Sequence, residues 1–201
     1  MLAKKLLVFY LLVWFYLAIE PVDRFDWLLD NLLIILFVPT LAYSYRYFRF
    51  SDVSYVLITV FLLLAAVGAH YAYTFTPVGE WLKELMGFSR NHYDRIVHFA
   101  FGLLLVYPLQ ELLVRVVAVP VKWSYVLAPL LIVSFSALFE VAEAIVAELV
   151  NPELGIMFLG AQGDIWDAQK DIILSLFGAM LTMAIAYRLS GKSGRDFPDR
   201  R

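Results

Sequence analysis

The chain has 201 residues, of which 62% are hydrophobic and 16% aromatic, and its mean hydropathy is +0.76. Soluble domains contain about 45–50% apolar residues, so this composition indicates a membrane protein. The formal net charge of -2, without a basic stripe, argues against nucleic-acid binding. The sequence has no cysteine, which excludes disulfides, iron–sulfur clusters and thiolate metal sites.

Six long apolar runs follow one another along the chain, and each approaches the roughly 20 residues that a helix needs to cross a membrane. The predicted spans are Leu2–Ile19, Leu28–Phe48, Val53–Phe75, Ile96–Val117, Ser124–Val150 and Ile172–Leu189. The first run lacks a small-residue cleavage site before Glu20, so we expect a retained helix. The predicted fold class is therefore all-α, a single polytopic bundle of six transmembrane helices over residues 1–190 with a polar cytoplasmic tail over 191–201.

Lysine and arginine are unevenly shared between the two sides of this topology. One side carries Lys4, Lys5, Arg46, Arg49, Arg115, Lys122, Arg188, Lys192, Arg195, Arg200 and Arg201. The other side carries Arg24, Lys83, Arg90, Arg95 and Lys170. Because basic loops stay in the cytoplasm, both termini are predicted to be cytoplasmic.

The outer loop "TPVGEWLKELMGF" has the pattern of a short amphipathic helix. It begins with Thr76 and Pro77, a favourable helix start. Trp81 and Leu85 then lie opposite charged residues, which predicts a helix lying on the outer membrane surface. A plain connector and a lid over a site are equally compatible with this pattern.

Acidic residues and histidines gather at the outer ends of the expected helices. Asp94 and His98 are four residues apart and share one helix face. A charged side chain near a helix centre costs about 2.5–3.5 kcal/mol, and neighbouring carboxylates repel one another unless they are protonated or neutralised by a cation. The sequence therefore predicts a metal site, which Asp26 and Asp30 of the second helix could approach from the side.

The available ligands are imidazole and carboxylate groups, which suit Zn, Mn or Mg. The predicted metal ligands are His70, His98, Glu140, Glu143 and Asp171. The predicted catalytic residues are Asp167, as a general base, and Asp94; the predicted substrate-binding residues, for a lipid phosphate, are Arg95 and Lys170.

Structural interpretations of the same residues remain open. A lone intramembrane His or Glu often bonds a neighbouring helix, an interaction worth about 0.6 kcal/mol on average. Asp164 is also a natural N-cap for the last helix. Further along that helix, Ser175, Gly178 and Thr182 form a small-residue stripe, which predicts close packing against another helix.

The blocks "GAHYAY", "RNHYDRIVHFAFGLLLVYP", "FE..E" and "GAQGDIWDAQKD" resemble the YjdF-like family of bacterial inner-membrane proteins, whose function is unknown. The resemblance covers nearly the whole chain and implies an inner-membrane location. "DRIVHFAFGLLL" and "QKDIILSLFGA" are also similar to the VanZ-like membrane proteins, which are linked with glycopeptide-antibiotic tolerance. That similarity implies cell-envelope chemistry, and the positions matching its pattern are Asp94, Arg95, His98, Glu140, Asp167 and Asp171.

Three functions are compatible with these features. The first is a metal-dependent intramembrane hydrolase or transferase whose substrate is a lipid or another envelope amphiphile. The second is a proton- or ion-coupled transporter, and the third is a non-catalytic envelope assembly or stress protein. The polar residues stop at one depth and the chain shows no internal repeat of the kind many carriers have. These two features favour the enzyme, with membrane lipids as partners.

Overall fold

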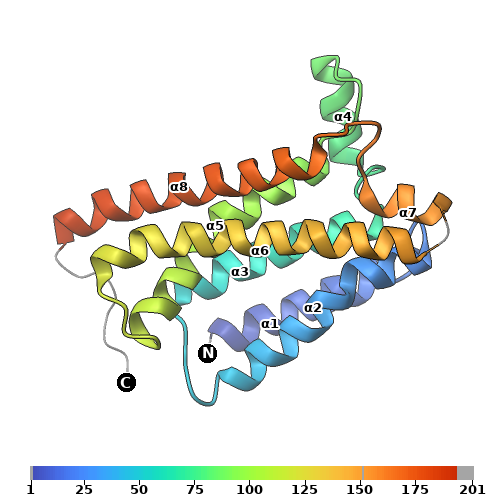
Figure 1. The fold of residues 1–201 in the computed structure, drawn as a ribbon. Coiled ribbons are helices and arrows are strands. Elements are labelled where there is room, and N and C mark those ends of the chain that lie inside the picture. The colour runs from blue at the N-terminus through green and yellow to red at the C-terminus, as the bar shows by residue number, and fades with distance from the viewer. Residues whose placement is uncertain (1, 151, 194–201) are drawn as a thin grey trace.

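The computed structural model describes residues 2–150 and 152–193, which form eight helices and no strand. The long helices are α1 (Leu2–Leu17), α2 (Arg24–Ser44), α3 (Asp52–His70), α5 (Tyr93–Arg115), α6 (Val121–Leu149) and α8 (Asp167–Ser193). They run approximately along one axis and form a bundle (Figure 1). The two short helices are α4 (Pro77–Met86) and α7 (Pro152–Leu159). The predicted all-α fold class is confirmed.

Each predicted span corresponds to one long helix. Helices α2, α3, α5, α6 and α8 are long and apolar enough to cross a membrane. Helix α1 has 16 residues, or about 24 Å at roughly 1.5 Å per residue, which is less than the ~30 Å hydrocarbon core. The sixth span and the cytoplasmic termini therefore stay predictions. Helix α8 continues to Ser193, past the predicted domain end at residue 190, and residues 194–201 of the predicted tail lie outside the described residues.

Helix α5 occupies the centre of the bundle and packs against α3, α6 and α8. Its closest contact is with α8, where the predicted small-residue stripe lies against it. A Cβ atom at Gly178 would collide with the Phe99 carbonyl oxygen, and one at Gly102 with the Ser175 carbonyl oxygen. The Thr182 hydroxyl donates to the Leu103 carbonyl at 2.6 Å. The predicted close packing of this stripe is confirmed, and it holds α8 and its acidic residues against α5.

This contact leads to a prediction about stability. In Gly178→Val, the new side chain would overlap the backbone of Phe99 and Leu103 and force the two helices apart. We expect the free energy of unfolding to fall by about 1–3 kcal/mol, measured by thermal unfolding in detergent. Ala144→Val, on an exposed face of α6, should stay within about 0.5 kcal/mol of wild type. Equal losses in both variants would contradict the role of the contact.

The end of the bundle at which α3 begins is tied together by one buried carboxylate. Glu111 is 1% exposed and accepts hydrogen bonds from the Ser51 amide at 2.8 Å, the Ser51 hydroxyl at 2.9 Å and the Ser54 hydroxyl at 2.5 Å. It also forms an ion pair with Arg115, whose guanidinium donates to the Arg49 carbonyl at 3.0 Å. These bonds join the start of α3 to the end of α5, a connection that the sequence did not predict.

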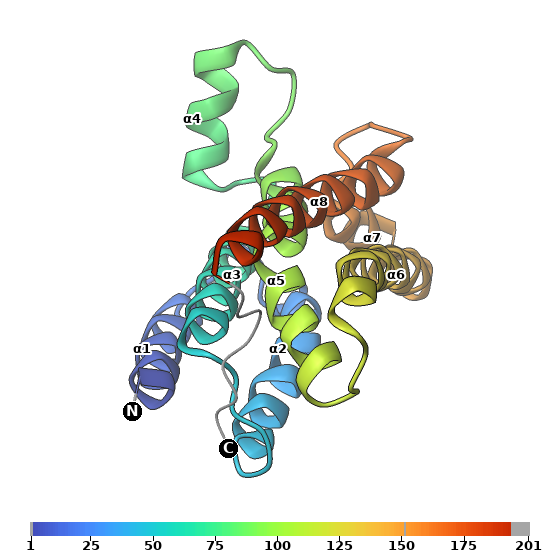
Figure 2. The same ribbon diagram turned by 90° about the vertical axis from the view of Figure 1, so that its left-hand side faces the viewer.

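Helix α4 extends away from the bundle with its axis across the bundle axis (Figures 1 and 2). Its start is held by Asn91, whose side-chain amide donates to the Thr76 carbonyl at 3.1 Å. Its exposed apolar side chains are Val78, Trp81, Leu85 and Met86. The predicted helix is confirmed, and its direction is the one that an interfacial helix takes. Its contact with the membrane surface stays a prediction.

Candidate functional site

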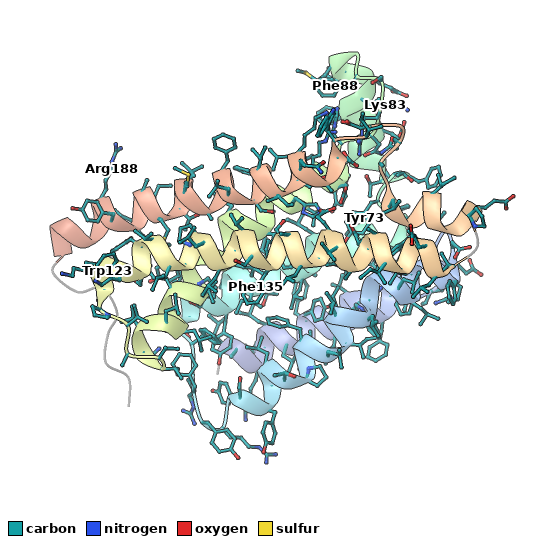
Figure 3. The ribbon with its side chains drawn as sticks, viewed as in Figure 1. Tyr73, Lys83, Phe88, Trp123, Phe135 and Arg188 are labelled. Atoms are coloured by element: carbon teal, nitrogen blue, oxygen red, sulfur yellow. The ribbon has the colours of Figure 1, made fainter. Side chains whose placement is uncertain are left out.

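Three of the predicted site residues meet at the end of the bundle that Tyr73 marks in Figure 3. Asp94, His98 and Asp171 each offer one atom that could bind a metal, and these three atoms lie within 4.8 Å of one another. Asp94 and His98 lie one turn apart on α5, as their spacing predicted, and Asp171 approaches from α8. The His98 Nε2 atom is 3.6 Å from Asp94 Oδ1 and 3.4 Å from Glu140 Oε1 on α6. Three helices thus bring three carboxyl groups to one imidazole.

Several carboxyl oxygens around this group have no hydrogen-bond partner among the described residues. They are Asp26 Oδ1, Asp30 Oδ2, Glu140 Oε1 and Asp171 Oδ1, and all four atoms are buried. A buried acceptor without a partner costs about 1–3 kcal/mol. Such a group therefore calls for an ion, a proton or an ordered water to satisfy it.

Beside these carboxyl groups lies a network of ion pairs between arginine and aspartate side chains. Arg90 is 6% exposed, and its two terminal nitrogens donate to Asp167 at 2.5 and 3.1 Å. They also donate to the carbonyl oxygens of Ala161 at 2.9 Å and Gly160 at 3.2 Å. This bidentate pairing is the strongest interaction that a guanidinium and a carboxylate form. It fixes the start of α8 against the segment preceding α5.

The predicted substrate-binding residues join the same network through Asp164. Arg95 Nη2 lies 2.5 Å from Asp164 and 2.8 Å from Asp167, and Lys170 Nζ lies 2.5 Å from Asp164. Hydrogen bonds from Lys170, the Trp166 amide and Arg95 hold the pKa of the Asp164 carboxyl well below its usual range. The structure therefore brings Arg95 and Lys170 together, in ion pairs rather than free.

His70 is not brought into the group that contains His98. Its Nδ1 atom lies 2.7 Å from the Leu17 carbonyl oxygen, and its ring packs edge-on against Tyr71. The imidazole thereby connects the end of α3 to the end of α1. This contact is the interhelical hydrogen bond that was the alternative interpretation of an intramembrane histidine.

Glu143 lines a small cavity together with Asp94, and His98 is not among the residues lining that cavity. The polar side chains lining that cavity are Asp26, Asp30, Tyr73, Asp94 and Glu143, and Phe158 and Leu159 of α7 close it. Tyr73 has a φ of 50°, a strained conformation for a bulky residue. The Tyr73 side chain therefore lines this cavity from a strained backbone, which the sequence did not indicate.

Arg90 and the two residues after it are the main part of the site that the sequence did not predict. The Asn91 side chain accepts a hydrogen bond from the Tyr93 amide at 3.0 Å, and the Asn91 backbone exchanges two bonds with the Gln162 side chain, at 2.9 and 3.0 Å. His92 lies 3.3 Å from Arg95. Burial and the charges of Arg95 and Arg90 lower the pKa of His92, so this ring is neutral at pH 7. The only sequence signal was a cluster of polar residues, "SRNH", directly before a helix.

Comparisons with known proteins agree with the membrane character of the chain. The family model described as "Predicted membrane protein (DUF2238)" matches residues 2–192. The inner membrane protein YjdF of Escherichia coli (strain K12) is 33% identical over 187 residues, which cover 92% of this chain and 89% of that protein. No solved structure matches the chain significantly. The resemblance to the YjdF-like family is confirmed, whereas the VanZ-like similarity stays a prediction.

Proposed function

The chain belongs to the DUF2238 family of membrane proteins, and from the geometry of its polar site we propose that it is a metal-dependent membrane enzyme. The proposed reaction is hydrolysis or group transfer on a lipid or another envelope amphiphile. The observation that carries the proposal is the group formed by Asp94, His98 and Asp171, with its ligand atoms within 4.8 Å of one another. Oxygen and imidazole donors of this kind suit Mn, Mg or Zn.

The charge balance of the site supports a bound cation. Asp94, Glu140 and Asp171 lie around a single imidazole inside helices long enough to span a membrane. Their repulsion is relieved by protonation or by a neutralising charge, and we propose that a cation supplies that charge. The nearest guanidinium groups, those of Arg90 and Arg95, are already paired with Asp164 and Asp167. A divalent cation held by Asp94, His98 and Asp171 supplies the missing charge.

The contacts change the roles that the sequence suggested for three carboxyl groups, of which Asp94 becomes a metal ligand instead of a catalytic residue. Asp167 accepts bonds from both Arg90 and Arg95, so we assign it a positioning role. Glu140 is the better general base because its Oε1 atom has no hydrogen-bond partner and lies 3.4 Å from His98 Nε2. A metal at this place would polarise a phosphoryl or acyl oxygen and lower the pKa of a bound water.

The mouth of the site offers positive charge to an anionic head group. The Lys170 side chain is 46% exposed and the Arg95 side chain 18% exposed, and both share Asp164. A phosphate that displaces Asp164 would gain charge-assisted bonds from both side chains. The proposed substrate is therefore an anionic amphiphile that approaches from the bilayer.

Transport is less well supported because the carboxyl groups do not continue through the bundle. An apolar cluster that includes Val106, Ala128 and Ile132 fills the region between α5, α6 and α8. Beyond it lies Glu111, which accepts bonds from Ser51, Ser54 and Arg115. The polar site lies at one end of the bundle and the apolar cluster separates it from the other end, which fits an enzyme better than a carrier.

The proposal is tested by elemental analysis of detergent-purified protein that has been reloaded with Zn, Mn or Mg. We expect about one metal ion per chain in wild type, and loss of that ion in Asp94→Asn and His98→Ala because each removes a ligand. Glu84→Gln changes an exposed acid on α4 and should keep the ion. A screen of phospholipid hydrolysis with and without chelator would follow.

Two results of the elemental analysis would overturn the proposal. One is a wild-type protein that takes up none of the three metals. The other is a metal content that is equal in wild type and His98→Ala.

A further inference from the structure

A separate cleft with a volume of about 170 Å³ lies between α1, α2 and α3, at the end of the bundle opposite Asp94, His98 and Asp171. Its walls are mostly aliphatic and include Leu7 of α1, Leu41 of α2 and Ile58 of α3. An apolar cavity of roughly 150 Å³ is enough to bind a small hydrocarbon. This cleft therefore has room for a length of acyl chain.

The cleft exists because α1 and α2 are joined at one end and separated at the other. Near the outer end, Trp14 Nε1 donates to Asn31 Oδ1 at 2.6 Å, and the Trp14 and Trp27 rings lie 5.4 Å apart. Toward the inner end the two helices diverge, and each packs on α3 instead (Figure 2). The opening between them faces the leaflet that surrounds the start of α1.

Two polar groups in the cleft indicate what kind of molecule fills it. Tyr10 is 2% exposed, and its hydroxyl has no hydrogen-bond partner among the described residues. Because a buried hydroxyl without a partner is costly, an acceptor on a ligand would satisfy it. Lys4 lies at the same cleft, six residues or about 9 Å closer to the helix start. An ammonium group at that level attracts an anionic head group.

We propose that this cleft binds one anionic glycerophospholipid, with an acyl chain against Ile58, an ester oxygen at the Tyr10 hydroxyl and the phosphate at Lys4. Arg46 and Arg49 follow α2 on the same side and add positive charge around the head group. The lipid fills the space that the diverging helices leave and so stabilises the α1–α2 pair against α3. This site is independent of the metal proposed at the outer end.

The first test is a titration of delipidated protein in maltoside detergent with phosphatidylglycerol, followed by native mass spectrometry. Wild type should retain one lipid per chain. Ala42→Phe, which fills the cleft, should bind at least tenfold less, whereas Ala144→Phe on exposed α6 should bind as wild type does. Lys4→Ala should reduce the preference for phosphatidylglycerol over phosphatidylcholine about fivefold. Equal lipid binding by Ala42→Phe and Ala144→Phe would overturn the proposal.

A second test does not depend on whether the Ala42 variant folds. In lipid-free detergent, Tyr10→Phe should melt at or above the wild-type temperature because it removes an unsatisfied hydroxyl. With phosphatidylglycerol, the rise in melting temperature should be smaller in Tyr10→Phe than in wild type. An equal rise in both proteins would show that the hydroxyl does not contact the lipid, and the assignment would be wrong.

Discussion

Replacing Arg90 with glutamine is expected to lower the free energy of unfolding by about 3–5 kcal/mol, the range found when one partner of a buried ion pair is removed. Arg90 is 6% exposed and satisfies both Asp167 oxygens as well as the carbonyls of Gly160 and Ala161. Glutamine cannot reach all of these acceptors with its single amide group. The loss would be measured by denaturant or thermal unfolding in detergent.

Matched variants separate this effect from a general loss of surface charge. Lys83→Gln removes an exposed pair with Glu80 on α4 and should cost at most about 0.5 kcal/mol. Adding Asp167→Asn to Arg90→Gln should recover part of the loss, since the acceptor left behind is then neutral. If Arg90→Gln costs no more than Lys83→Gln, the network is not what holds the start of α8.

The helical spans were predictable because hydropathy alone specifies them. Six apolar runs gave six helices, with boundaries that differ by a few residues. Helix α8 begins at Asp167, two residues later than an N-cap at Asp164 would place its start. Helix α7 was not predicted because it is 8 residues long and its apolar sequence differs little from the end of α6.

The candidate site was predictable in part, since the sequence placed His98, Glu140 and Asp171 in one group and the structure brings them together. A spacing of four residues placed Asp94 and His98 on one face, and the structure keeps them there. Which helices are neighbours, and how each is rotated, depends on packing that periodicity does not encode. For that reason His70 was expected in the cluster but contacts Leu17, while the pairing of Arg90 with Asp167, 77 residues away, was missed.

If a metal binds as proposed, Asp171→Asn should stabilise the protein in the absence of metal and weaken its stabilisation by metal. Without metal, Asp171→Asn should raise the melting temperature, because it removes a buried carboxylate from the group around His98 that also contains Asp94 and Glu140. Saturating Mn²⁺ should stabilise wild type by about 2.7 kcal/mol at a hundred times its dissociation constant. Asp171→Asn lacks a ligand and should gain almost nothing from the ion.

Asp26→Asn is the matched control for this reversal, because Asp26 also has a buried oxygen without a partner but is not part of the metal group. It should melt higher than wild type without metal and still gain from Mn²⁺ as wild type does. The two variants therefore separate relief of repulsion, which both share, from loss of a ligand, which belongs to Asp171 alone. A full Mn²⁺ gain in Asp171→Asn would place the ion elsewhere, and the buried acids would then be held by protons or by hydrogen bonds.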